Sequence, residues 1–298
     1  MTVRLKHLSE YLALRLTAAL VNRLPYRVAL LIGWLNAWTA FYLFRLRVHE
    51  AKSRIREVFK NRFSDREVNR IAWQSWRNIV FNGIELIRFK NMTLDWVLSV
   101  SDCEPVIDTL KRHIQTGRGA IIACPHMGSW DLAGVTAHLS GIPIFNIVAR
   151  QKNPWANDYL NALRTSPGVD SITRGSGAVL DIIQKLKAGG MLAILPDVRM
   201  RTGGIQVSFL GGEANIGEGM ATFARHVDIP IFPCVASRHG WSHHKIEIFD
   251  PVWPDNNLDK DEDIRRMTVA VMGIFEAAIR RNPGQWFWFN KRWILEPR

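Results

Sequence analysis

Short apolar runs separated by helical patterns dominate the chain from about residue 105 onward. The runs are five to eight residues long and cover residues 119–124, 143–148, 191–195, 229–236 and 245–249. Runs of this length are too short for helices and are typical of strands buried on both faces. A helix is expected from Gly177 to Lys187, ending at Gly189-Gly190. This alternation predicts an α/β sheet covered on both sides, with ligand chemistry at the carboxyl ends of the strands.

The N-terminal part of the chain has a different pattern. An uncharged apolar stretch runs from Val28 to Phe44; as a helix it would be ~26 Å long, slightly short of a ~30 Å hydrocarbon core. Trp34, Trp38 and Tyr42 lie within it and are typical of a membrane interface. Three interpretations are open: a single spanning helix, a helix lying in the interface or partly buried on the protein, and a core helix of a soluble protein. A cleaved signal peptide is disfavoured, because the apolar run starts late and no small-residue cleavage site follows.

A second helix signal follows this stretch. Ser64 and Glu67 form a capping-box pattern, and apolar residues then recur at helical spacing as far as Val80. We therefore expect a helical hairpin between the N-terminal segment and the α/β part. The chain is interpreted as a basic membrane-anchoring region at residues 1–62 and an α/β domain at residues 63–298.

Charge supports an anionic partner. The 298 residues carry 39 Lys+Arg against 27 Asp+Glu, a net charge of +12, and residues 1–62 hold twelve of the cations but only three acids. Such a surface attracts anionic lipid, nucleic acid or an acidic protein. A nucleic-acid binder is disfavoured, because no helix-turn-helix, zinc or ribonucleoprotein pattern is present and the charge lies beside an apolar run. Three widely spaced cysteines form no metal pattern and suggest a reducing compartment.

The candidate chemistry directly follows the first predicted strand. His126 would stand at the strand end, and Asp131 lies five residues further on, near the start of the next helix. A carboxylate on one ring nitrogen of a histidine fixes the tautomer and leaves the other nitrogen free as a base. The pair would form the base and orienting acid of a triad whose nucleophile is a substrate hydroxyl. No metal and no cofactor are expected.

Six blocks in order resemble the bacterial lipid A late acyltransferase family (the lauroyl and myristoyl acyltransferases). That family is related to the glycerol-3-phosphate acyltransferases and to the phosphatidylinositol mannoside acyltransferase of mycobacteria. The blocks are Leu24-Pro25-Tyr26, the segment from His126 to Asp131, Arg150 to Pro154 with Asp158 and Arg164, Leu195-Pro196-Asp197 with the glycines after it, residues 221–233, and Pro283 to Trp293.

The resemblance implies a fold, a reaction and roles for further residues. The expected fold is a mixed β-sheet flanked by helices, like that of the glycerol-3-phosphate acyltransferases, with an N-terminal hydrophobic helix and helical hairpin. The expected reaction moves a fatty acyl chain from an acyl thioester to a hydroxyl of a lipid A precursor or related glycolipid, with His126 as the base and Asp131 as its orienting acid. Arg164 would stabilise the oxyanion, Arg150 and Arg174 would bind phosphate, and Asp197 would orient the acceptor or an arginine.

The resemblance also implies partners and a location. The co-substrate would be acyl carrier protein or acyl-CoA, the acceptor an anionic membrane glycolipid, and the location the cytoplasmic face of a bacterial inner membrane. The block after Asp197 departs from the family, because Val198 and Arg199 stand where a second acid is usual. Arg199 or Arg201 would then favour an acceptor with more phosphate or carboxylate. One alternative is another acceptor, such as a phosphatidylinositol mannoside or a lysophospholipid. The other is a catalytically silent scaffold role.

Overall fold

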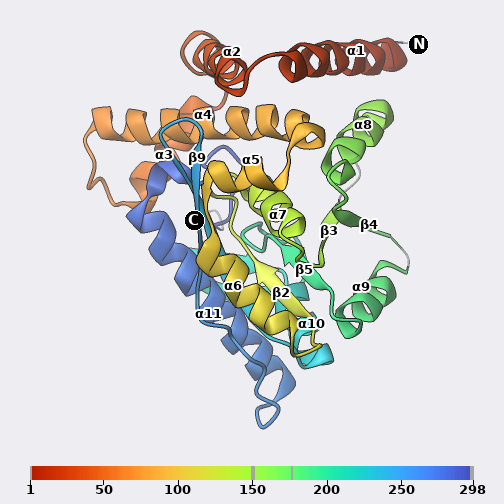
Figure 1. Cartoon of the computed structure of the whole chain (residues 1–298). Coiled ribbons are helices and arrows are strands. Elements are labelled where there is room, and N and C mark those ends of the chain that lie inside the picture. Colours follow the sequence, from red (N-terminus) through yellow and green to blue (C-terminus); the bar gives the residue numbers. More distant parts are fainter. Residues whose placement is uncertain (1, 149–151, 176, 296–298) are drawn as a thin grey trace.

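A seven-stranded sheet forms the centre of the protein. The computed structural model describes residues 2–148, 152–175 and 177–295 (Figure 1). The strand order is β1-β9-β8-β2-β5-β3-β4. Strands β8, β2, β5, β3 and β4 run parallel, and β9 is antiparallel to β8. The bounds are Ser101–Asp102 (β1), Ala120–Ala123 (β2), Ile144–Val148 (β3), Asp170–Thr173 (β4), Met191–Ile194 (β5), Ile231–His239 (β8) and His243–Ile248 (β9). The expected mixed α/β sheet is therefore confirmed.

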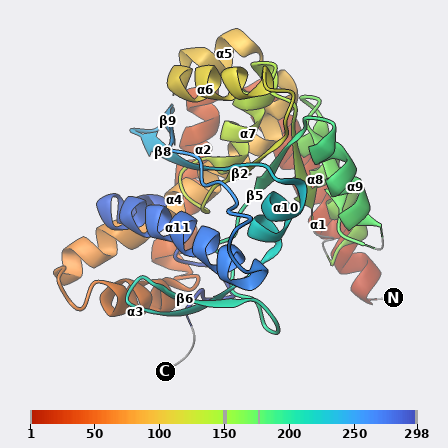
Figure 2. The same ribbon diagram turned by 90° about the horizontal axis from the view of Figure 1, so that it is seen from below.

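Helices cover both faces of this sheet (Figure 2). Alternate residues of β2 show the two layers, because successive side chains of a strand point to opposite faces. Ile121 and Ala123 pack in the cluster formed with α10 and α11, whereas Ala120 and Ile122 pack with α6. The helices of this part are Leu94–Ser99 (α5), Glu104–Ile114 (α6), Trp130–Leu139 (α7), Pro154–Thr165 (α8), Ala178–Lys187 (α9), Gly219–Val227 (α10) and Lys260–Arg281 (α11).

All five apolar runs form strands, but four further strands were not expected from the sequence. Strands β1 and β4 lie at the two edges of the sheet, and the hairpin of Ile205–Phe209 (β6) and Gly212–Ile216 (β7) forms a separate two-stranded sheet. β4 and the hairpin carry polar or exposed residues at alternate positions, and β1 is only two residues long. Short, half-exposed strands leave no continuous apolar run, so periodicity alone does not reveal them.

The N-terminal helices lie across the long helix α4, Asp65–Arg88 (Figure 1). The expected capping box is present, since Ser64 and Glu67 exchange the side-chain and backbone hydrogen bonds that define it. Ahead of α4 come Thr2–Arg23 (α1), Tyr26–Trp38 (α2), a π-helical turn at Thr39–Leu43 (η1), and Val48–Val58 (α3). Leu30 and Phe41 are buried, whereas Leu35, Leu43 and Phe44 are exposed. The apolar stretch thus covers the protein on one side and presents apolar side chains on the other.

No single helix in the described part of the chain is long and apolar enough to span a bilayer. The pair Tyr26–Leu43 and Val48–Val58, bent by 83°, has the length and composition of a broken span.

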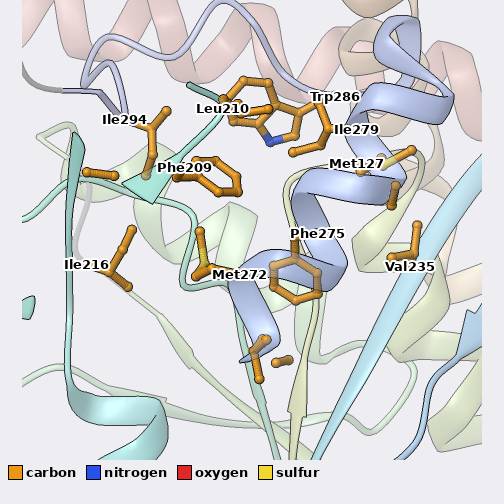
Figure 3. Close-up of a cluster of buried hydrophobic side chains, with 14 of the residues drawn as sticks. Met127, Phe209, Leu210, Ile216, Val235, Met272, Phe275, Ile279, Trp286 and Ile294 are labelled. Carbon is orange, nitrogen blue, oxygen red and sulfur yellow. The ribbon is translucent and has the colours of Figure 1, made fainter. Parts of the chain in front are cut away.

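A large buried cluster lies directly behind the loop that follows β2 (Figure 3). Met127 of that loop packs in it together with Phe275 of α11 and with Trp286, which follows the short helix η3, Pro283–Gln285. Met127 and Trp286 also form an isolated β-bridge. Close packing of this kind has low compressibility, so the cluster gives the neighbouring His126 a rigid support.

Candidate active site

Two equivalent loops bring His126 and Asp197 together. Strands β2 and β5 are parallel neighbours in which Ala123 pairs with Ile194. His126 and Asp197 each follow their paired residue by three positions, directly after Pro125 and Pro196. In both loops the residue after the functional one donates a backbone hydrogen bond to the proline carbonyl, over 2.6 Å and 2.7 Å. Each functional residue is therefore the central residue of a tight three-residue turn.

The carboxylate of Asp197 binds His126 at two points. Nδ1 of His126 lies 2.7 Å from Oδ1, and the backbone N–H of His126 donates to Oδ2 over 2.8 Å. Nε1 of Trp286 also donates to Oδ2, over 2.8 Å. Asp197 is buried, at 3% exposure. Because an ionised carboxylate only accepts hydrogen bonds, this arrangement puts the ring proton on Nδ1 and leaves Nε2 as the free, basic nitrogen.

The electrostatics of the pair favour an ionised carboxylate beside a basic imidazole. Burial raises the pKa of Asp197, but the charge and hydrogen bonds of His126 and the Trp286 donor outweigh it, so the pKa lies below the ordinary value. Burial lowers the pKa of His126, but the charge and hydrogen bond of Asp197 outweigh it, so the pKa lies above the ordinary value of 6.5. A raised pKa makes the imidazole a stronger acceptor for a substrate proton.

The hydrogen-bond partner of the His126 ring differs from the one expected. Asp131 lies in the first turn of α7, lines the same cavity and raises the pKa of His126 through its charge, as the smallest of the contributions. Its own pKa is raised, chiefly by burial and against the lowering effect of Arg164. Asp197 forms the hydrogen bond with Nδ1 instead, because β5 pairs with β2 and the loops that follow the two strands therefore lie side by side. The spacing of His126 and Asp131 along the chain does not reveal that the loop carrying Asp197 lies beside His126.

The His126 loop is held in place from three sides. Asn82 Nδ2 of α4 donates to the carbonyl of Gly128 over 2.6 Å, and the Gly128 N–H donates to the carbonyl of Gln285 over 3.0 Å. The N–H of Phe287 donates to the carbonyl of His126 over 3.0 Å. Gly128 has φ +59°, and a Cβ there would lie 2.4 Å from the carbonyl oxygen of Ala236. Only glycine lets this backbone turn and approach β8 so closely.

A buried ion pair lies behind this loop. Both carboxylate oxygens of Glu85 accept from Arg238, over 2.6 Å and 2.7 Å, and neither side chain is exposed. Glu85 also accepts from the hydroxyl of Ser129 over 2.6 Å and from Tyr26 over 2.5 Å. Arg238 donates to Asn82 as well, over 2.8 Å. The network therefore joins α2, α4, β8 and the start of α7, and it positions the segment that carries His126.

The other predicted residues gather around one cavity of about 680 Å³. His126, Asp131, Arg164, Arg174 and Arg199 all line it. Arg164 comes from α8, and Arg174 follows β4. Arg199 also donates to the carbonyl of Leu295 over 3.4 Å. The cavity walls include apolar side chains from several elements, among them Phe89, Val135, Ile147, Val169 and Ile194. Arg150 lies outside the described residues, so its predicted phosphate contact stays a prediction.

Sequence reasoning missed several residues that shape this site. The sequence analysis did not single out Glu85, Arg238 and Asn82. Two of them are charged residues among the apolar positions of α4 and β8. Such a position indicates a buried ion pair, because buried charges require partners. Gln285 and Trp286 were noted only as part of the block from Pro283 to Trp293. Trp286 is buried, and it also donates to Asp197. Arg292 lines the cavity and was likewise not expected there.

Comparisons with known proteins agree with this architecture. Residues 2–294 match the family described as bacterial lipid A biosynthesis acyltransferase. The phosphatidylinositol mannoside acyltransferase of Mycolicibacterium smegmatis is 26% identical over 195 residues, which cover 64% of this chain and 62% of that protein. The protein of the same name from Mycobacterium tuberculosis strain CDC 1551 is 22% identical over 198 residues, covering 64% of this chain and 59% of that protein. The match thus spans less than two thirds of either relative. With nearly its whole length matched, the chain belongs to the bacterial lipid A biosynthesis acyltransferase family.

Proposed function

We propose that the protein transfers a fatty acyl chain from an acyl thioester to a hydroxyl of a membrane glycolipid, with His126 as the general base. The observation that carries the proposal is the hydrogen bond between His126 Nδ1 and Asp197. It leaves Nε2 as the basic nitrogen of a residue that lines the 680 Å³ cavity. Membership of an acyltransferase family supplies the class of reaction.

The reaction proceeds in two proton transfers. His126 takes the proton of the acceptor hydroxyl as the oxygen attacks the thioester carbonyl, and Asp197 stabilises the imidazolium that forms. The tetrahedral oxyanion then collapses, the carbon–sulfur bond breaks, and the leaving thiolate takes the proton from His126. The charge of Arg164 is the largest contribution that lowers the pKa of Asp131, and we assign Arg164 to the oxyanion or to the thioester carbonyl. A fixed donor of this kind is worth ~2.7–4 kcal/mol in other enzymes.

The cavity also supports an anionic acceptor. Arg174, Arg199 and Arg292 line it, and forked guanidinium groups bind phosphate well. We assign the acceptor as a lipid A precursor or a related glycolipid, and the donor as acyl carrier protein or acyl-CoA. The relatives' names favour a second candidate acceptor, a phosphatidylinositol mannoside. We place the enzyme at the cytoplasmic face of the inner membrane, held there by the basic N-terminal region at residues 1–62.

The test compares His126→Ala with the wild-type enzyme on an acyl thioester and each glycolipid, with acyl transfer followed by mass spectrometry. Removal of a general base costs ~10²–10⁴-fold. His138→Ala is the matched control, because His138 lies on α7 but does not line the cavity. Activity within a few-fold of wild type in folded His126→Ala protein would refute the assignment. An absence of transfer by the wild-type protein with every acceptor would favour the scaffold alternative.

A further inference from the structure

The second large cavity of the protein, about 920 Å³ in volume, lies between the end of α3, the first half of α4 and the end of α11. It shares no lining residue with the cavity that contains His126. Every ionisable side chain that lines it is cationic. The six are Lys60, Arg62, Arg70, Arg77, Arg280 and Arg281.

Four of these cations form no ion pair within the described part of the chain. Arg280 pairs with Glu276 and Arg281 with Glu247, but Lys60, Arg62, Arg70 and Arg77 have no carboxylate within ion-pair distance. Of the nearby acids in the sequence, Asp65 pairs with Arg56. Glu67 accepts from Ser64, and the charge of Arg70 is a smaller contribution that lowers the pKa of Glu67. The cavity lining therefore carries more positive charge than its ion pairs balance.

Arg77 is the half-buried member of this set of unpaired cations. Its guanidinium is half-buried, and its hydrogen bonds go to the neutral side chain of Asn78. Burial, together with the charge of Arg238, lowers its pKa from 12.5 to about 10. An anion in the cavity would offset both effects, since a half-buried charge is stabilised when it gains an opposite charge.

The backbone around the cavity is strained on two sides. Lys60 and Asn61 adopt φ values of +48° and +59°, and Leu210 adopts +52° next to the lining residue Gly211. Left-handed conformations are unfavourable for residues other than glycine. Such strain concentrates at functional sites.

The surroundings of the cavity indicate which anion it takes. Trp73 lines the cavity and contacts Tyr42 of η1, with the two ring centroids 5.3 Å apart. Tyr42 is 41% exposed, and the neighbouring Leu43 and Phe44 are 67% and 65% exposed. A cationic cavity beside an exposed apolar and aromatic surface matches an amphiphile with an anionic headgroup. A polynucleotide would bind the cations but leave the exposed apolar side chains without a partner.

We propose that this cavity is a second lipid site, distinct from the catalytic one, which binds the phosphate headgroup of an anionic membrane lipid while η1 and the residues after it contact the acyl region. The volume exceeds what a single phosphate needs and lies within the range of ligand pockets. The proposal does not depend on acyl transfer, because binding to the site is measured without substrate turnover.

The experiment measures binding of the full-length protein to vesicles of phosphatidylcholine with and without phosphatidylglycerol. The test variant is Arg62→Gln with Arg70→Gln, two exposed cavity cations. The matched control is Lys111→Gln with Arg112→Gln, which removes the same charge from exposed positions on α6. Lys60→Gln is a second cavity variant on another segment. Thermal unfolding and circular dichroism verify that each variant is folded.

We expect the double cavity variant to lose on the order of 30-fold in affinity for the anionic vesicles, from ~1 kcal/mol for each cation near the surface. The control should stay within about threefold, and Lys60→Gln should weaken binding by about fivefold. Equal losses in the cavity and control variants would show a diffuse charge effect and overturn the site.

A second arm separates a lipid headgroup from free phosphate. Short-chain phosphatidylglycerol below its micelle concentration and inorganic phosphate are each titrated as competitors of vesicle binding. We expect the short-chain lipid to compete at concentrations where inorganic phosphate does not. Equal competition by inorganic phosphate, or an oligonucleotide that binds with the same dependence on Arg62 and Arg70, would refute the lipid assignment.

Discussion

Oδ1 of Asp197 lies 2.7 Å from Nδ1 of His126, at the ends of two adjacent parallel strands. The carboxylate also accepts from the backbone N–H of the same histidine, so it fixes both the position of the loop and the tautomer of the ring. A neutral amide at this position could still accept the backbone hydrogen bond but would lack the charge beside the imidazole. We therefore expect removal of the charge to affect the chemistry more than the fold.

Asp197→Asn should lower kcat by ~10²–10⁴-fold, the range of a general base that is lost or wrongly protonated. An amide can donate its own hydrogen to Nδ1, which favours the tautomer with the proton on Nε2 and removes the base. Trp286→Phe deletes one donor to the same carboxylate but keeps its charge, so the loss should be far smaller. Steady-state kinetics on folded protein would decide, and equal losses in the two variants would contradict the assigned role of the carboxylate.

The acid limb of the pH–rate profile should lie above the ordinary histidine pKa of about 6.5, because the pKa of His126 is raised. Asp197→Asn removes the largest raising contribution and leaves the lowering effect of burial, so the limb should move to lower pH. Asp131→Asn should move it in the same direction by less, since Asp131 makes the smallest of these contributions. A larger shift in Asp131→Asn would reverse the assignment of the two acids.

Gly128→Ala should destabilise the protein and abolish activity. The new Cβ would lie 2.4 Å from the carbonyl oxygen of Ala236, so either the His126 loop or β8 must move. Gly117 also has a positive φ but has open space around it, which makes Gly117→Ala the matched control for strain alone. Urea unfolding should give ~1 kcal/mol for the control and clearly more for Gly128→Ala.

Glu85→Gln should lower the free energy of unfolding by ~3–5 kcal/mol, because it leaves the charge of Arg238 buried without a counter-ion. The exposed Glu57→Gln should change it by no more than ~0.5 kcal/mol. Denaturant unfolding at neutral pH measures both. A Glu85→Gln protein as stable as wild type would mean that the pair contributes little to holding α4 against β8.

Serine substitutions at Leu35, Leu43 and Phe44 should weaken attachment to membranes while leaving the unfolding midpoint nearly unchanged, because these side chains are exposed. Serine at Leu30 should instead destabilise the fold, since Leu30 is buried against α4. Vesicle flotation at high salt measures the apolar part of the attachment, because salt screens charge. Complete release of the wild-type protein by salt would contradict an apolar contribution.

Elements whose burial follows a local period were predictable from the order of residues. The five apolar runs, the capped start of α4 at Ser64 and the order of the motif blocks are all properties of neighbouring residues, and they were sufficient to predict the α/β class and His126 as the candidate base. The half-exposed strands β4, β6 and β7 were not predicted, because apolar and polar residues alternate in them or too few residues are apolar.

The carboxylate that binds His126, and the residues that hold its loop, depend on how distant segments pack together. Asp197 reaches the imidazole because β5 pairs with β2, and this order of strands depends on packing between distant segments rather than on any local period. The cationic cavity has the same origin, since Lys60, Arg77 and Arg281 come from α3–α4, α4 and α11. Helix and strand periods are short-range, whereas charges and hydrogen bonds act between whichever groups the core brings within a few ångströms.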